Sequence, residues 1–124
     1  MDHPSLAQTQ STPLILFDET THTLSIVGES FPENSFAFYA PVLDWLKQYL
    51  LRNQVLVLDL AITYMNSSST KCMLDLLDLM EDAHARGVQV SVIWRYDQEN
   101  PRSFELAEEF SEEVSFTFEI VALA

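Results

Sequence analysis

The chain has 124 residues, of which 48% are hydrophobic and 20% charged. This length and composition predict one folded globular domain with its own core and exclude a disordered tail. Its 19 Asp and Glu residues against 6 Lys and Arg residues give a formal net charge of −13, which repels nucleic-acid phosphates and favours basic protein surfaces as partners. We therefore expect no nucleic-acid partner.

Two further features of the sequence bear on the cellular compartment. Cys72 is the only cysteine, so no disulfide can form within the chain, which suits a reducing cytoplasm. Residues 1–4 lack the basic and apolar regions of a secretory signal, and no apolar run approaches the roughly 20 residues of a membrane-spanning helix. We expect a soluble, cytoplasmic protein without membrane insertion.

The first part of the chain predicts an arm followed by a β-hairpin. Residues 1–11 are polar and unpatterned, and they predict a loose N-terminal arm before a single domain of residues 12–124. Residues 14–17 predict a strand because all four are apolar, and residues 23–27 predict a second strand because Leu24 and Ile26 alternate with their neighbours. The turn of the hairpin is expected at residues 18–21.

A first long helix is indicated by apolar residues that recur at helical spacing between Tyr39 and Leu50. Ser35 is a candidate N-cap of this helix. Pro41 disfavours helical backbone at Ala40. The helix therefore either starts near Pro41 or is distorted there, and the sequence leaves both alternatives open.

Residues 55–64 (VLVLDLAITY) form a nearly continuous apolar run rich in β-branched side chains. Such a run predicts a central strand that is buried on both faces. Asp59 lies inside the run, and a carboxylate in that position must be paired or lie at an edge or end of the sheet. We interpret Asp59 as a structural residue.

The rest of the chain predicts two further helices and two further strands. A helix, a strand, a short acidic helix and a last strand are expected at about residues 69–86, 88–96, 102–113 and 115–123. The resulting order, ββαβαβαβ, implies right-handed crossovers between parallel neighbours, extended by the antiparallel hairpin. We therefore expect an α/β fold with one mixed sheet and helices packed on it.

No residue set of the sequence forms a convincing catalytic or metal site. His3, His22 and His84 are scattered, and none has a partner at ligand spacing. Cys72 has no histidine near it in sequence to act as a base, so we interpret it as a buried, inert core residue. A small enzyme that uses Cys72 or Asp59 is the less favoured alternative. We expect no cofactor and no bound metal.

Four hydroxyl residues in a row, Ser67, Ser68, Ser69 and Thr70, join the central strand to the following helix. Asn66 or one of the serines must cap this helix, but a cap uses one side chain and does not explain four hydroxyls. A hydroxyl at a helix N-terminus faces free backbone N–H groups and the positive end of the helix dipole, which accommodate a phosphate well. A phosphorylation switch is therefore the functional alternative to simple capping.

The layout strand, Asn, hydroxyls, helix resembles the STAS domains of anti-sigma-factor antagonists. The closer resemblance is to the SiaC-like regulatory phosphoproteins of bacteria, and it spans nearly the whole chain. It rests on residues 10–13 (QSTP), 30–35 (SFPENS), 64–69 (YMNSSS) with Lys71, 81–87 followed by 90–92 and Trp94, and 106–110 (LAEEF). The Phe31–Ser35 stretch is the most distinctive of these segments.

This resemblance implies a STAS-like domain that acts as a non-enzymatic switch. Family members are phosphorylated on the first hydroxyl after the Asn, which is Ser67 here, with Ser68 and Ser69 as alternates because serine stands where we expect the family's threonine. A dedicated serine/threonine kinase adds the phosphate and a PP2C-type phosphatase removes it.

The resemblance also implies the target of the switch. The unphosphorylated form is expected to bind and activate a diguanylate cyclase, in cyclic-di-GMP signalling and biofilm formation. Met65, Asn66, Ser68 and Lys71 are the expected partner-binding residues. The alternative within the same class is an anti-sigma-factor antagonist whose partner is a serine kinase.

Overall fold

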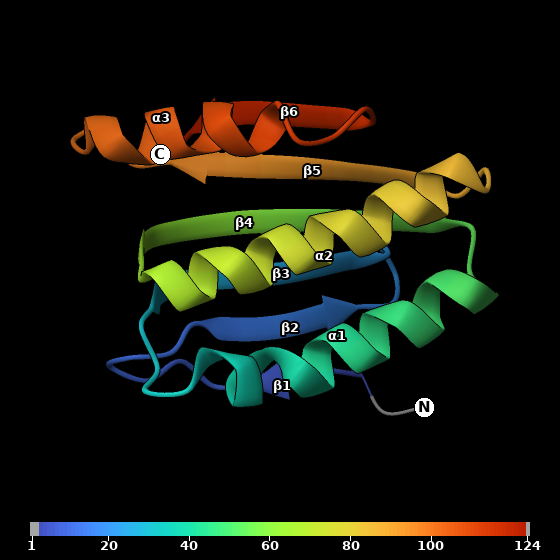
Figure 1. Ribbon diagram of the computed structural model, residues 1–124, viewed down its shortest axis with the longest axis horizontal. Helices are drawn as coiled ribbons and strands as arrows, with labels where there is room; N and C mark the ends of the chain where they lie inside the picture. The colour runs from blue at the N-terminus through green and yellow to red at the C-terminus, as the bar shows by residue number, and fades with distance from the viewer. Residues whose placement is uncertain (1–2, 124) are drawn as a thin grey trace.

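A computed structural model describes residues 3–123. Within this range, six strands form one sheet in the order β1-β2-β3-β4-β5-β6, and three helices lie on one face of it (Figure 1). The elements are β1 (Ser5–Leu6), β2 (Leu14–Asp18), β3 (Thr23–Ser30), α1 (Ser35–Arg52), β4 (Val55–Met65), α2 (Ser67–Ala85), β5 (Gln89–Tyr96), α3 (Pro101–Ser111) and β6 (Thr117–Ala122). Strands β1 to β3 pair antiparallel, and β3 to β6 pair parallel.

The helices share one face because the parallel strands are added in chain order. Each crossover from β3 to β6 moves to the next position in the same direction, and right-handed crossovers then place every connecting helix on the same side. Alternate strand residues turn toward the helices and form the core. Those fully or nearly fully buried include Ile15, Phe17, Leu24, Ile26, Leu56, Leu58, Leu60, Val90, Val92 and Trp94. The expected mixed sheet with helices packed on it is thus confirmed.

The opposite face of the sheet carries no helix in the part of the chain that the structure describes. In β4, Leu56, Leu58 and Leu60 are buried, whereas Val57 and Asp59 between them are only half-buried. The prediction that residues 55–64 are buried on both faces is therefore wrong. A continuous apolar run is typical of strands with helices on both sides, but the one-directional strand order covers one side only.

The structure contains one strand, β1, that precedes the predicted order ββαβαβαβ and that the sequence did not predict. Ser5 and Leu6, within the segment expected to be a loose arm, pair with Leu16 and Ile15 of β2. Two exposed residues are too short a stretch to produce an alternating pattern in the sequence. The predicted hairpin of β2 and β3 is confirmed, with Leu14 paired to Val27 and Asp18 to Thr23.

Helix α1 starts at Ser35 and not near Pro41, so the first of the two alternatives derived from Pro41 is wrong. Its N-cap is Asn34, whose Oδ1 accepts a hydrogen bond of 3.0 Å from the backbone N–H of Ala37. The prediction of Ser35 as the N-cap is wrong, because Asn34 fills that role and Ser35 is the first helical residue. Pro41 lies inside the helix on its exposed side, where water can satisfy the backbone carbonyl that loses its partner.

Asp59 and Arg95 form a bidentate ion pair between β4 and β5 on the face without helices. Arg95 Nε donates to Asp59 Oδ1 at 2.9 Å and Nη2 donates to Oδ2 at 3.1 Å. Of the two alternatives that the sequence left open for Asp59, pairing and a place at an edge or end of the sheet, the structure shows pairing. No helix within residues 3–123 is long and apolar enough to cross a membrane.

We expect the coupling between Asp59 and Arg95 to contribute about 0.5–1 kcal/mol to the free energy of unfolding, since the arginine side chain is partly exposed and solvent screens the pair. A double-mutant cycle of D59N, R95Q and D59N/R95Q, followed by urea unfolding, measures the coupling. A coupling energy indistinguishable from zero would show that the pair does not stabilise the sheet.

Candidate functional site

The candidate site lies at the edge of the sheet where the parallel strands end. β4 ends and α2 begins there, and the first turn of α3 lies at the same end of the molecule (Figure 1). The end of β3 is attached to this edge as well, because the backbone N–H of Asn66 donates to the carbonyl of Ser30 at 3.0 Å. Several helix N-termini therefore open toward one edge.

Asn66 is the residue that caps α2. Its Oδ1 accepts a hydrogen bond of 2.9 Å from the backbone N–H of Ser69, and its backbone carbonyl accepts from the hydroxyl of Thr70 at 3.1 Å. The helix consequently begins at Ser67, two positions before the start expected near Ser69. The hydroxyl run is thus the first turn of the helix and not a loop that precedes it.

Two of the motifs that are far apart in the sequence meet in a buried hydroxyl cluster of Ser30, Ser35, Tyr39 and Ser69, each at most 1% exposed. The Tyr39 and Ser30 hydroxyls lie 2.6 Å apart, Ser30 donates to Ser69 at 2.8 Å, and Ser69 and Ser35 lie 3.1 Å apart. The cluster ties the end of β3 to the starts of α1 and α2. Buried hydroxyls with complete partners rigidify the segment that carries them.

The Tyr39 hydroxyl is protonated and acts as a hydrogen-bond donor in this cluster. Burial raises the pKa of the Tyr39 hydroxyl to about 12, and the hydrogen bond with Ser30 lowers it by a smaller amount. Tyr39 therefore keeps its proton at neutral pH. Because Ser30 donates its one hydroxyl hydrogen to Ser69, Tyr39 is the donor in the bond with Ser30. The direction of the hydrogen bonds runs toward the start of α2.

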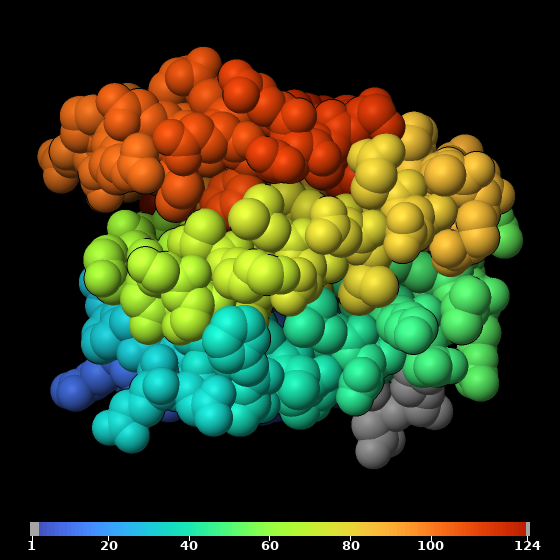
Figure 2. Space-filling model, in the orientation of Figure 1, coloured from blue at the N-terminus to red at the C-terminus, as the bar shows by residue number. Residues whose placement is uncertain are grey.

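Ser67 differs from its three hydroxyl neighbours. Ser69 is buried in the cluster, Ser68 donates to the Ser35 hydroxyl at 2.8 Å, and Thr70 donates to the carbonyl of Asn66. Ser67 is exposed, and no hydrogen bond of its hydroxyl occurs among the residues that the structure describes. In Figure 2 the start of α2, in yellow-green, reaches the surface between α1 and α3.

A cavity of about 270 Å³ opens beside Ser67. Its lining residues come from the end of β4, the first turn of α2, and the N-cap and first two turns of α3: Ile62, Thr63, Tyr64, Met65, Ser67, Thr70, Asn100, Arg102, Ser103 and Leu106. Of the expected partner-binding residues, only Met65 lines this cavity. Asn66 and Ser68 form internal hydrogen bonds, and Lys71 is paired with Asp75.

Exposed aromatic side chains surround the site, and the sequence did not single them out. Tyr64 is 54% exposed and lies 5.8 Å from Phe31 between ring centroids. Phe36, at the start of α1, is 56% exposed. Both Phe31 and Tyr64 belong to the segments that carry the family resemblance, and this membership is the feature of the sequence that could have identified them as site residues. Exposed aromatic groups of this kind are enriched at protein interfaces.

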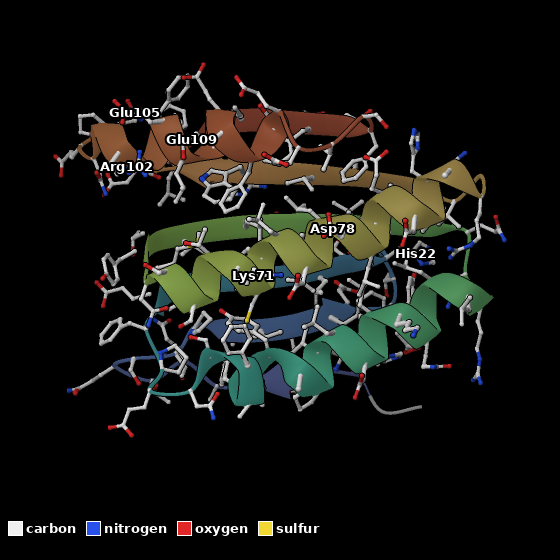
Figure 3. All side chains as sticks on the ribbon, viewed as in Figure 1. His22, Lys71, Asp78, Arg102, Glu105 and Glu109 are labelled. Carbon is white, nitrogen blue, oxygen red and sulfur yellow. The ribbon has the colours of Figure 1, made fainter. Side chains whose placement is uncertain are left out.

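Of the other candidate residues, His3 and His22 line one cavity, where His3 Nε2 lies 3.1 Å from a carboxylate oxygen of Glu19, whereas His84 and Cys72 lie elsewhere. His22 lies at the end of the molecule away from Arg102 (Figure 3), and His84 contacts Phe116. Within residues 3–123 no three His, Cys, Asp or Glu side chains could hold a metal ion together. Cys72 is fully buried, and burial raises the pKa of its thiol, with Asp75 adding to the effect. The interpretation of Cys72 as a buried core residue is confirmed.

Comparison with known proteins identifies the family. Residues 6–123 match the model of the SiaC family regulatory phosphoproteins. The chain belongs to this family. It is 50% identical over 115 residues to an uncharacterized protein of Pseudomonas aeruginosa (strain UCBPP-PA14), which covers 92% of this chain and 91% of that protein.

Solved structures show the same fold. The chain is similar to SiaC of Pseudomonas aeruginosa, with 45% identity and a TM-score of 0.92 over 99% of this chain and 100% of that chain. It is also similar to a chain in the crystal structure of the diguanylate cyclase SiaD in complex with its activator SiaC from Pseudomonas aeruginosa. That match has 49% identity and a TM-score of 0.89, over 94% of this chain and 96% of the other.

Proposed function

We propose that this protein is a non-enzymatic switch that binds and activates a diguanylate cyclase when Ser67 is unphosphorylated and releases it when Ser67 is phosphorylated. Family membership supports a regulatory role, and a relative of 49% identity has been solved in complex with a diguanylate cyclase as its activator. The observation that carries the choice of residue is that Ser67 is exposed while Ser68, Ser69 and Thr70 form internal hydrogen bonds.

The chemistry of the site explains how a phosphate would act. It would add about −1.5 to −2 charges next to exposed aromatic groups, so a partner that covers Phe31 and Tyr64 would have to desolvate a dianion. The free N–H groups of the first turn of α2 would stabilise the same dianion in the unbound protein. Phosphorylation would therefore favour the free state over the complex.

The proposal includes the enzymes that operate the switch and the roles of neighbouring residues. A serine/threonine kinase and a PP2C-type phosphatase, acting in the cytoplasm, require an acceptor that they can reach, and the exposure of Ser67 meets this requirement.

Met65 and Lys71 would contact the partner directly. Asn66 and Ser68 would act through the hydrogen bonds that hold the first turn of α2. We also propose that the fold is related to that of STAS domains.

We expect Ser67→Ala to bind the cyclase encoded in the same host as tightly as wild type, and Ser67→Asp to bind at least about tenfold more weakly. Isothermal titration calorimetry with the purified cyclase measures both affinities. Thr20→Asp, which adds the same charge in the turn between β2 and β3 at the far end of the molecule, is the matched control.

Equal affinities of Ser67→Ala and Ser67→Asp would contradict the switch. Mass spectrometry of the protein purified from its own host provides the second check, because it locates the phosphate directly. Modification of Ser68 or Ser69 in place of Ser67 would contradict the assignment of the acceptor.

A further inference from the structure

One cation lies in the cavity beside Ser67, and the proposed switch does not use it. Arg102 is in the first turn of α3 and lines the same cavity of about 270 Å³ as Ser67 and Thr70. Figure 3 shows Arg102 at the end of α3 that lies on the same side of the molecule as the start of α2. Among the residues that line this cavity, Arg102 is the one with a positive charge.

The present partners of Arg102 hold it weakly. Its Nη1 lies 3.5 Å from a carboxylate oxygen of Glu105 and 3.4 Å from one of Glu109. All of these side chains are mostly exposed, and contacts of this length in water contribute little stability. The guanidinium is therefore available to a stronger acceptor in the cavity, at the cost of two weak contacts.

Positive charge is scarce in this chain, which makes its position informative. The sequence has 6 Lys and Arg residues against 19 Asp and Glu. Arg95 is committed to Asp59 on the other face of the sheet, and Lys71 is paired with Asp75 along α2. In a chain with a net charge of −13, a dianion at Ser67 would need local compensation.

We propose that Arg102 binds the phosphate on Ser67 within the same molecule, so that phosphorylation joins the first turns of α2 and α3 and closes the cavity between them. This inference rests on the proposed function in that Ser67 must carry the phosphate. A guanidinium matches phosphate oxygens bidentately, and a phosphate near −2 is a stronger acceptor than either carboxylate. Arg102 then exchanges Glu105 and Glu109 for the phosphate.

Closing the cavity has a consequence for partner binding. Met65, Tyr64 and Leu106 line its walls together with Arg102. When Arg102 bridges to the phosphate, these side chains are less available to an incoming partner. The modification thus acts in two ways, through the charge itself and through the removal of an apolar recess.

Lys71 is the competing cation, because it follows Ser67 by four positions on the same helix and the two can approach each other. It is paired with Asp75, which raises the pKa of the Lys71 ammonium, and it does not line the cavity. A test of the proposal therefore has to compare Arg102 with Lys71.

The test uses protein with phosphoserine installed at position 67 by genetic encoding, and phosphorus NMR titration of the phosphate. An unperturbed phosphoserine has a second pKa of about 6. We expect the pKa of this phosphate to lie lower in the parent protein, R102Q to raise it by about 0.5 unit or more, and K71Q to leave it nearly unchanged. E109Q removes a competitor for Arg102 and should lower the phosphate pKa further.

An R102Q titration that coincides with that of the parent protein would overturn the proposal, as would a larger shift in K71Q than in R102Q. Arg102 is exposed, so its replacement should leave the fold intact, and circular dichroism verifies this. Because the phosphate is installed directly, the titration depends on no kinase and no cyclase. Loss of the cyclase-binding switch and loss of the Arg102 contact are thus separate results.

Discussion

Ser69→Asp is expected to lower the free energy of unfolding by about 3–5 kcal/mol, whereas Ser67→Asp should change it by less than about 0.5 kcal/mol. Ser69 is 0% exposed and its hydroxyl is bonded inside the buried hydroxyl cluster. A carboxylate there has no cation to pair with in the cluster, so its desolvation is not compensated. Urea unfolding followed by circular dichroism measures both variants.

The difference in stability between Ser69→Asp and Ser67→Asp tests whether only the exposed hydroxyl of the run can carry a charge. Ser69→Ala is the matched control, because it removes the hydroxyl without adding a charge and should cost about 1–2 kcal/mol for the donor left unpaired at Ser30. If Ser69→Asp proved as stable as wild type, the cluster would tolerate a charge. Desolvation of a charge would then not be what distinguishes Ser69 from Ser67 as a phosphoacceptor, and the difference in exposure alone would remain.

Trp94→Ala is expected to destabilise the fold by about 3–5 kcal/mol, the usual cost of truncating a large buried aromatic side chain. Trp94 is on β5 and is 0% exposed. Its ring lies 5.2 Å from that of Phe110 on α3 and 6.4 Å from that of Phe118 on β6. The substitution therefore removes side-chain packing between β5 and both α3 and β6.

Phe104→Ala serves as the control, because Phe104 is an aromatic residue of α3 whose side chain is 38% exposed, and it should cost less than about 1 kcal/mol. Urea unfolding of both variants gives the comparison. Similar losses for Trp94→Ala and Phe104→Ala would contradict the central position of Trp94. Since Arg102 is on α3 as well, a loosened α3 in the Trp94 variant should also weaken any contact between Arg102 and a phosphate at Ser67.

Elements with a strong local pattern could be predicted from the sequence alone. The hairpin of β2 and β3 follows from two apolar runs around a polar turn, and α3 begins at Pro101, which suits a first helical turn. For Asp59 the sequence predicted either an ionic partner or a place at an edge or end of the sheet, because a carboxylate inside an apolar strand needs one or the other, and the structure shows a partner. Which residue would be that partner, Arg95, could not be predicted.

Choices between neighbouring residues of similar chemistry could not be predicted. Asn34 and Ser35 are both good caps, and Asn34 fills the role while Ser35 lies in the buried hydroxyl cluster. Whether α1 starts near Pro41 or continues through it was left open by the sequence, and the structure places Pro41 inside the helix. The helix continues through the proline because its other side is buried against the sheet, which the local preference of a proline does not reveal.

The sequence by itself determined the alternation of strands and helices, the buried character of Cys72, and a helix that starts within a run of hydroxyls. These features depend on spacing, propensity and hydrophobicity, which are local properties of the chain. Only the tertiary structure decided which hydroxyl is accessible. Ser67 and Ser69 point to different sides of one helical turn, and the positions of β3 and α1 determine which side is covered. The physical reason is that burial depends on what packs against a residue, and those groups come from distant parts of the chain.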